Sequence, residues 1–248
     1  MKQIEFPTCW EEVKPQEFIY LLKLRQYLID KPGVSLTDIK LKWCDYVLSN
    51  RGAKRKNDQR YLLLAQLAET LSWQWQVTDN LIELTYDSTL NLISKIGKYI
   101  GPKSHGADLT FFQFRKGITI AQEYDATSDP ECLVQLAALL YPGSQGRFQR
   151  YILFGIYAWF AYFTQFVFSG TFIIEGKEVC FAPLFESSEE EKEDNMGLSG
   201  ILFSVAESGV FGTATDVDKI EVLQILLKML NDKQQADYLA ERINHDLK

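Results

Sequence analysis

Apolar side chains recur through most of the chain at intervals of three and four residues, the spacing that places them on one face of an α-helix. Pro15 suits a first helical position, because the N–H that proline lacks has no partner there in any helix. Ser35 has the character of a helix N-cap, and Ser128 opens a capping box with an early proline. The predicted helices cover residues 15–30, 35–47, 61–75, 111–121 and 128–141.

The hydrophobic period changes twice along the chain. Side chains alternate over residues 81–86, which predicts one short strand. Two β-prone runs surround Glu175-Gly176-Lys177, so residues 171–182 predict a β-hairpin in which glycine supplies the positive φ of a tight turn. The sequence therefore predicts a mainly α-helical fold with a small β-hairpin and one additional short strand. Three further helices are predicted over residues 197–208, 216–230 and 233–244.

Residues 151–168 form an apolar and aromatic run that only Gly155, Thr164 and Gln165 interrupt. A helix with apolar surface all round has to be hidden from water, so we expect a central helix buried on every side. Its 18 residues also meet the lower limit for crossing a membrane. Thr164, Gln165, the aromatic composition and the lack of a basic stop disfavour a membrane span. A core helix that also forms an oligomer or partner surface is the other interpretation.

An acidic run divides the chain. Residues 186–195 carry six acidic side chains and one lysine, a net charge of −5. Like charges repel and offer nothing to bury, so we interpret residues 186–196 as an acidic linker. It would separate a main helical domain, residues 1–185, from a C-terminal helical segment, residues 197–248. Docking of the acidic run to a basic partner is the alternative.

The whole chain has a formal net charge of −7, from 26 Lys and Arg against 33 Asp and Glu. This sign disfavours a nucleic-acid-coating role, which depends on neutralising phosphates. Residues 51–60 are locally basic but lack interleaved aromatic residues, so a solvated loop is the simpler interpretation. A hydrophobic content of 46 % excludes wholesale disorder. Four scattered cysteines and an N-terminus without an apolar signal core favour a cytoplasmic protein.

Residues suited to catalysis or metal binding are scarce. His105 and His245 are the only histidines, and the sequence has no H-E-x-x-H motif and no C-x-x-C pair. We therefore predict no catalytic residues, no metal and no cofactor. Residues 143–146 (GSQG), followed by two arginines, indicate a helix–helix turn, with a weak anion site as the alternative. An enzyme using the Gly-rich loop 97–107 and His105 is a further hypothesis, which a deep polar pocket around His105 would favour.

Four segments of the sequence, taken together, indicate a resemblance to known proteins. They are FPTCWEEVKPQEFIYLLKL (6–24), IGPKSHGADLTFFQFRKG (100–117), LVQLAALLYPG (133–143) and GILFSVAESGVFGTATDVDKIEVLQILLKML (200–230). In their order and spacing they resemble tail-module proteins of tailed phages and prophages. The nearest type is the tail assembly chaperone that is encoded beside the tape-measure gene.

This resemblance implies a non-enzymatic binding protein of the bacterial host cytoplasm, which holds an apolar, tape-measure-like helical partner during tail assembly. The aromatic content of 13 % suits such a role, because aromatic side chains bring large contact areas. Trp159, Phe163 and Phe166 are the candidate partner-binding residues. The alternatives are another structural tail or neck component and a membrane-associated protein anchored by residues 151–168. Homo-oligomerisation is left open.

Overall fold

The structure is a computed structural model that describes residues 5–53, 58–79, 81–185 and 198–246. This part of the chain holds nine α-helices and three short antiparallel strand pairs, so the predicted mainly α-helical fold is confirmed. The helices are α1 (Pro15–Asp30), α2 (Leu36–Asn50), α3 (Asp58–Glu69), α4 (Phe111–Thr127), α5 (Pro130–Leu140), α6 (Arg150–Ser169), α7 (Leu198–Glu207), α8 (Ala214–Val217) and α9 (Val222–Asp246). The strand pairs are β1 (Trp75–Thr78) with β2 (Leu81–Leu84), β3 (Lys95–Ile96) with β4 (Tyr99–Ile100), and β5 (Thr171–Ile174) with β6 (Lys177–Cys180).

Short polar side chains begin two of the helices near the predicted positions. The Ser35 hydroxyl accepts a hydrogen bond from the Asp38 N–H at 3.1 Å, and α2 starts at the next residue. Helix α5 starts at Pro130, but its cap is Asp129 and not Ser128. Ser128 instead ends α4 in a left-handed conformation with φ 56°. The capping box expected at Ser128 is therefore replaced by a single cap bond, in which the Asp129 side chain accepts from the Glu131 N–H at 2.9 Å.

The helix predicted over residues 61–75 is too long. Helix α3 ends at Glu69, and Leu71 lies in a 3₁₀ turn that leads into β1. Trp75 fits the helical period, yet it begins β1 and pairs with Leu84 of β2. The single strand predicted over residues 81–86 is thus the second strand of a hairpin. The first strand, β1, escaped prediction because Trp75 is buried and continues the helical spacing of the buried residues Leu64, Ala68 and Leu71.

The helices of the C-terminal part also differ from the prediction. Helix α7 matches the predicted helix over residues 197–208. Residues 216–230 and 233–244, predicted as two helices, belong largely to the single helix α9, which the short α8 precedes. An ion pair between Lys228 and Asp232, four residues apart, spans the predicted break and supports the helix there.

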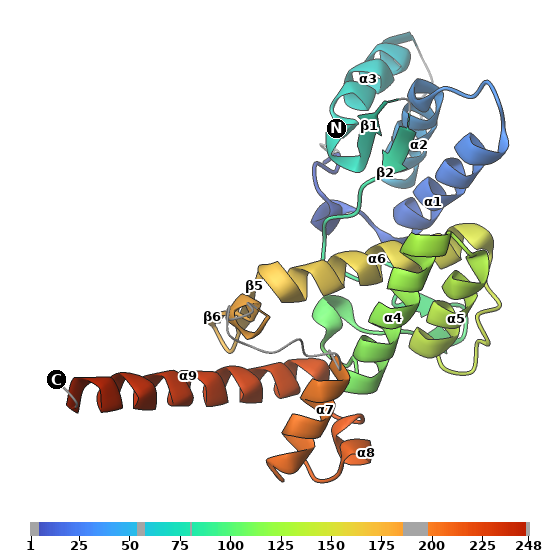
Figure 1. Ribbon diagram of the computed structural model, residues 1–248. Helices are drawn as coiled ribbons and strands as arrows, with labels where there is room; N and C mark the ends of the chain where they lie inside the picture. Colours follow the sequence, from blue (N-terminus) through green and yellow to red (C-terminus); the bar gives the residue numbers. More distant parts are fainter. Residues whose placement is uncertain (1–4, 54–57, 80, 186–197, 247–248) are drawn as a thin grey trace.

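Helix α6 is the central element of the fold (Figure 1). It packs against α1, α4 and α5, and the predicted hairpin β5–β6 follows it directly. Figure 1 also shows the second half of α9 extending away from the body as a single helix. The expectation that α6 is buried on every side is wrong: Gln165 is exposed, and neighbouring residues on that face are only half-buried. The three partner helices leave one strip of α6 uncovered.

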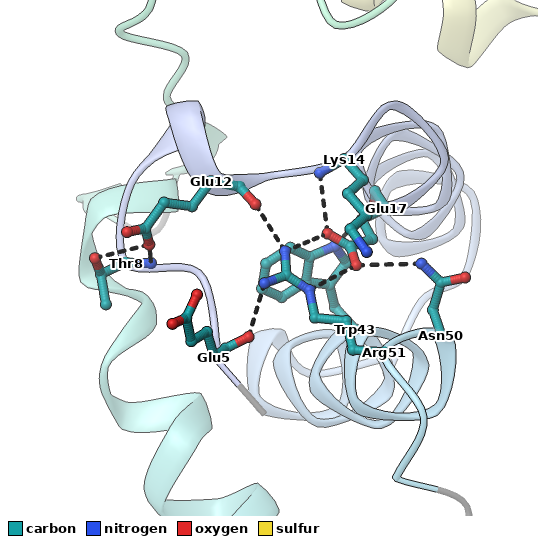
Figure 2. Close-up of polar contacts among 8 residues, drawn as sticks. All are labelled: Glu5, Thr8, Glu12, Lys14, Glu17, Trp43, Asn50 and Arg51. Atoms are coloured by element: carbon teal, nitrogen blue, oxygen red, sulfur yellow. Dashed lines mark hydrogen bonds and ion pairs between the residues drawn. The ribbon is translucent and has the colours of Figure 1, made fainter. Parts of the chain in front are cut away.

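A buried ion pair ties the N-terminal segment to the first two helices. The side chain of Glu17 is 0 % exposed and accepts hydrogen bonds from Arg51 Nε at 2.9 Å and Nη2 at 2.8 Å. Figure 2 shows the Glu17 carboxylate also receiving bonds from the Asn50 side chain and the Lys14 N–H. Arg51 in turn donates to the backbone carbonyl of Glu12 at 2.7 Å. Residues before α1 are thereby held against α1 and α2.

The C-terminal part is fixed to α4. Arg115 of α4 and Asp218 form a two-pronged ion pair with distances of 2.9 and 2.7 Å. The Phe111 N–H at the start of α4 donates to the Ile220 carbonyl at 2.8 Å. These contacts join α4 to the segment between α8 and α9. The predicted acidic linker, residues 186–196, lies outside the described residues.

Candidate binding groove between α4 and α6

Two of the three predicted partner-binding residues lie in the core. Trp159 is 1 % exposed and Phe163 0 % exposed, and their rings stack with centroids 5.6 Å apart. The Trp159 indole N–H donates to the Thr89 carbonyl at 3.2 Å. A Cβ added at Gly106 would lie 2.2 Å from the Phe163 ring, so the backbone there covers that ring closely. In this conformation Trp159 and Phe163 hold the fold together and present no surface to a partner.

The third predicted residue, Phe166, borders a cleft. It is half-buried and packs edge-on against Phe172 of β5, with centroids 4.9 Å apart. Together with His105, Leu223 and strand β5 it lines a cleft of about 540 Å³. Trp159 and Phe163 are thus buried, whereas Phe166 lines a cleft together with His105, the residue considered in the enzyme hypothesis.

A groove runs along the opposite face of α6, between this helix and α4. Its volume is about 450 Å³. On each helix the lining residues are three or four positions apart, which is one helical face. The lining residues are Ile118, Ala121, Gln122 and Asp125 from α4 and Ala161, Thr164, Gln165, Phe168 and Ser169 from α6.

Close contact between α4 and α6 forms the base of this groove. Gly117 of α4 lies against Phe160 of α6, and a Cβ at this glycine would be 2.4 Å from the ring. Nothing in the sequence explains a glycine in the middle of a helix, where it costs about 1 kcal/mol against alanine. The structure supplies one: the glycine lets the two helix backbones approach.

The groove contains an unsatisfied polar atom. The Thr164 hydroxyl oxygen is buried and has no hydrogen-bond partner within the described part of the chain. Buried polar atoms almost always have a partner, so this oxygen is an unsatisfied group in the groove wall, closed to solvent in this conformation. Gln122 and Gln165 are exposed beside it. The groove therefore combines four apolar residues with five polar ones.

A carboxylate lies at one end of the groove. Asp125 accepts a hydrogen bond from the Tyr157 hydroxyl. Burial raises the pKa of Tyr157, and the hydrogen bond to Asp125 raises it further. The phenol consequently stays protonated and fixes the carboxylate at the groove end.

Two of the residues that sequence reasoning selected for partner binding, Trp159 and Phe163, lie on a face of α6 that is buried in the structure. That reasoning selected the large aromatic residues, although those are also the side chains that the core needs most. The signal for the open face was present: Thr164 and Gln165, the two polar residues that interrupt the apolar run, both line the groove. The contribution of α4 had no such signal, because it depends on how two distant segments pack.

The enzyme hypothesis concerns His105, which lies in the 3₁₀ turn Ser104–Gly106. His105 is exposed and has φ 62°, and its Nδ1 lies 2.7 Å from the Thr89 hydroxyl. The cleft beside it is lined mainly by apolar residues, unlike the polar pocket that the enzyme hypothesis requires. No group of three His, Cys, Asp or Glu side chains that could hold a metal occurs among the described residues. The side chain of His245 lies outside them.

Helix α6 is also long and apolar enough to cross a membrane. The same property is found in core helices of soluble proteins, and half of its most apolar window is buried within the fold. Its length and composition are therefore weak support for a membrane anchor.

Comparisons with known proteins identify no relatives: no family model matches the chain, and no curated protein or solved structure is significantly similar to it. The site's geometry therefore carries the functional conclusion.

Proposed function

We propose that this protein is a non-enzymatic binding protein that holds an apolar helical segment of another protein in the α4–α6 groove. The observation that carries the proposal is the lining of the groove. Ile118, Ala121, Ala161 and Phe168 line the groove with apolar surface, and Gln122, Asp125, Thr164, Gln165 and Ser169 are the polar residues among them. A groove between two helices accommodates a third helix, whose side chains enter between theirs.

The groove also sets the chemistry of the bound helix. Its apolar face would lie over Ile118 and Phe168. A hydrogen-bonding group on that face would meet the exposed side-chain amides of Gln122 and Gln165. A basic residue at one end of the bound helix would meet Asp125. An amphipathic helix with one polar position inside its apolar face fits these requirements best.

The resemblance to tail-module proteins supports a tape-measure-like partner. We therefore propose a tail assembly chaperone of a phage or prophage, which acts in the bacterial host cytoplasm. Another structural tail or neck component is the alternative within the same binding function. The two differ in whether the protein leaves the partner once the tail is complete.

Co-expression with a tape-measure-like protein tests this function. The wild-type chain should keep that protein soluble and should co-elute with it on gel filtration. Ala161→Trp fills the groove from the side of α6 and should weaken the complex at least about tenfold, or about 1.4 kcal/mol. Glu123→Trp places the same bulk on an exposed position of α4 outside the groove and should have no effect.

Two outcomes contradict the proposal. One is a partner that is equally soluble alone and forms no complex with the wild-type chain. The other is a complex that Ala161→Trp leaves unchanged although circular dichroism shows the variant folded, because binding would then occur elsewhere.

A further inference from the structure

A second cavity lies in the N-terminal part of the molecule, among α1, α2 and α3. Its volume is about 690 Å³, and it shares no lining residue with the α4–α6 groove. Pockets that bind small molecules and cofactors are typically about 300–1,000 Å³ and are mostly apolar with a few polar groups. This cavity has both properties, as its walls and floor show.

The walls are aromatic and aliphatic. Tyr20 of α1 and Tyr46 of α2 stack almost in parallel, with centroids 4.1 Å apart and an interplanar angle of 19°. Leu41 and Leu64 line the cavity beside them. A flat ligand could lie against such a surface, because aromatic rings favour offset stacking.

The floor holds a carboxylate that a buried arginine fixes in place. Arg60 is 7 % exposed, and its Nε and Nη2 both contact Oδ1 of Asp45, at 2.8 and 2.7 Å. Nη2 also donates to the Ser49 hydroxyl at 2.8 Å. Both contacts of the arginine with the carboxylate go to one oxygen. Oδ2 of Asp45 accepts no hydrogen bond from any described residue, and the side chain is 38 % exposed.

Hydroxyl donors complete the polar lining. The Tyr20 and Tyr46 hydroxyls make no hydrogen bond within the described part of the chain, although both residues line the cavity. Burial raises the pKa of Tyr20, and the nearby negative charge of Asp45 raises it further. The Tyr20 phenol is therefore protonated at neutral pH and is available as a donor.

We propose that this cavity binds a planar nitrogen heterocycle whose edge carries an N–H donor beside a carbonyl or ring-nitrogen acceptor, as a nucleobase does. The N–H would donate to Oδ2 of Asp45, and the acceptor would take a tyrosine hydroxyl. The ring face would lie against the aromatic wall. Arg60 already balances the charge of Asp45, and the other charged lining residue, Lys42, is exposed to water, so an uncharged ring meets no buried unpaired charge in the cavity.

Calorimetric titration of the full chain with adenosine, guanosine, cytidine and uridine tests the proposal. At least one nucleoside should give a saturable heat. Tyr46→Phe removes only a hydroxyl and should weaken that binding by about 3–10-fold if this hydroxyl donates to the ligand. Tyr20→Phe tests the other hydroxyl, and one of the two variants must show the loss. Tyr99→Phe, outside the cavity, is the matched control and should bind like the wild type.

Two further variants test the position and the polarity of the site. Leu41→Trp fills the cavity from its wall and should abolish binding while the Asp45–Arg60 pair stays in place. Asp45→Asn places an N–H donor where Oδ2 accepts. The variant should therefore bind ligands with an N–H donor at this position more weakly than the wild type does. Its thermal midpoint shows whether the fold tolerates the change. If it does not, Leu41→Trp and the two phenylalanine variants still decide the matter.

The proposal is overturned if none of the four nucleosides shows saturable binding up to about 5 mM, a weaker affinity than a stacked and hydrogen-bonded ring should have. It is also overturned if Leu41→Trp binds like the wild type, or if naphthalene sulfonate, which has no N–H donor, binds as tightly as the best nucleoside. None of these results bears on the α4–α6 groove, which the cavity does not touch.

Discussion

Folding removes the carboxylate of Glu17 from water. The free-energy cost of burying this charge depends on the groups that hydrogen-bond to it. The side chain is 0 % exposed, and Arg51, Asn50 and the Lys14 N–H together satisfy both oxygens. Nothing in the sequence marks Glu17 as buried, because glutamate in the first turn of a helix is normally a solvated, dipole-stabilised residue. Its burial follows from Arg51, which lies 34 positions later in the sequence.

Removing the partner of this carboxylate should destabilise the protein strongly. Arg51→Met leaves Glu17 buried and short of two hydrogen bonds, and the free energy of unfolding should fall by about 3–5 kcal/mol. Glu17→Gln, which keeps the shape and removes the charge, should cost less. Urea denaturation at pH 7 measures both. A loss below about 1 kcal/mol for Arg51→Met would mean that the pair is open to water.

The same carboxylate should contribute to acid sensitivity. Burial raises the pKa of Glu17, but the hydrogen bonds from Arg51 and Lys14 outweigh it, and the net pKa lies below the ordinary value of 4.5. The unfolded state therefore takes up the proton first as pH falls. The stabilisation is complete above pH 4.5 and is lost as pH falls through the folded pKa.

Stability measured from pH 7 to pH 3 should thus fall less steeply in Glu17→Gln than in the wild type. Glu69→Gln, an exposed residue, is the matched control and should follow the wild-type curve. Parallel curves for all three proteins would contradict a lowered pKa at Glu17.

Replacing Gly117 with alanine would have two opposing effects, a gain in helix propensity and a steric clash with Phe160. Alanine there would gain about 1 kcal/mol in the helix. Its Cβ would lie 2.4 Å from the Phe160 ring, and overpacking of this kind typically costs about 1–3 kcal/mol. We expect the clash to prevail, so that Gly117→Ala lowers the unfolding free energy by about 1 kcal/mol. A stabilised variant in thermal denaturation would show that α4 and α6 can separate there without cost.

At the scale of elements, the sequence predicted best those helices whose ends carry local signals. Helices α1, α2 and α5 begin within two residues of the expected positions, since capping and proline geometry act over a few residues. The missed strand β1 and the merged helix α9 lack such signals. Trp75 obeys a helical period, and only its pairing with Leu84 makes it a strand residue. The secondary structure of β1 and α9 therefore depends on tertiary contacts rather than on local sequence signals.

The candidate groove could likewise be predicted only where a local sequence signal exists. Its α6 side could be read from Thr164 and Gln165, since polar residues in an apolar run mark the side that water reaches. Its α4 side could not, because residues 118–125 have no sequence feature that links them to residues 161–168. The contact through Gly117 and Phe160 makes that link, and it is a property of the packed structure.

Helix α6 should depend on its buried aromatic residues and tolerate changes on its open face. Trp159→Ala deletes a ring that is 1 % exposed and its hydrogen bond to Thr89, and should cost about 3–5 kcal/mol. Gln165→Ala, on the exposed face of the same helix, should stay within about 0.5 kcal/mol of the wild type. Thermal denaturation compares them, and equal midpoints would show that α6 is a peripheral helix.

At the scale of the whole molecule, α4 connects the two parts of the chain. One face of it packs on α5 and α6, and its first turn bonds the segment between α8 and α9. Arg115 and Asp218 add a half-buried, two-pronged ion pair to that contact. The division into a main domain and a C-terminal segment was predicted from charge alone. The structure adds a contact between those two parts that charge patterning could not predict.

This contact predicts that the two parts stay together when the chain is cut between them. With a specific protease site inserted within residues 186–195, the fragments after cleavage should co-elute on gel filtration. Arg115, Asp218 and the Phe111–Ile220 backbone bond would hold them. Asp218→Ala leaves Arg115 unpaired and should weaken the association several-fold, whereas Asp237→Ala on the exposed end of α9 should not. Fragments that separate in the unmutated protein would show instead that the C-terminal segment is an independent unit, because the contacts on α4 would then be too weak to hold it without the covalent connection.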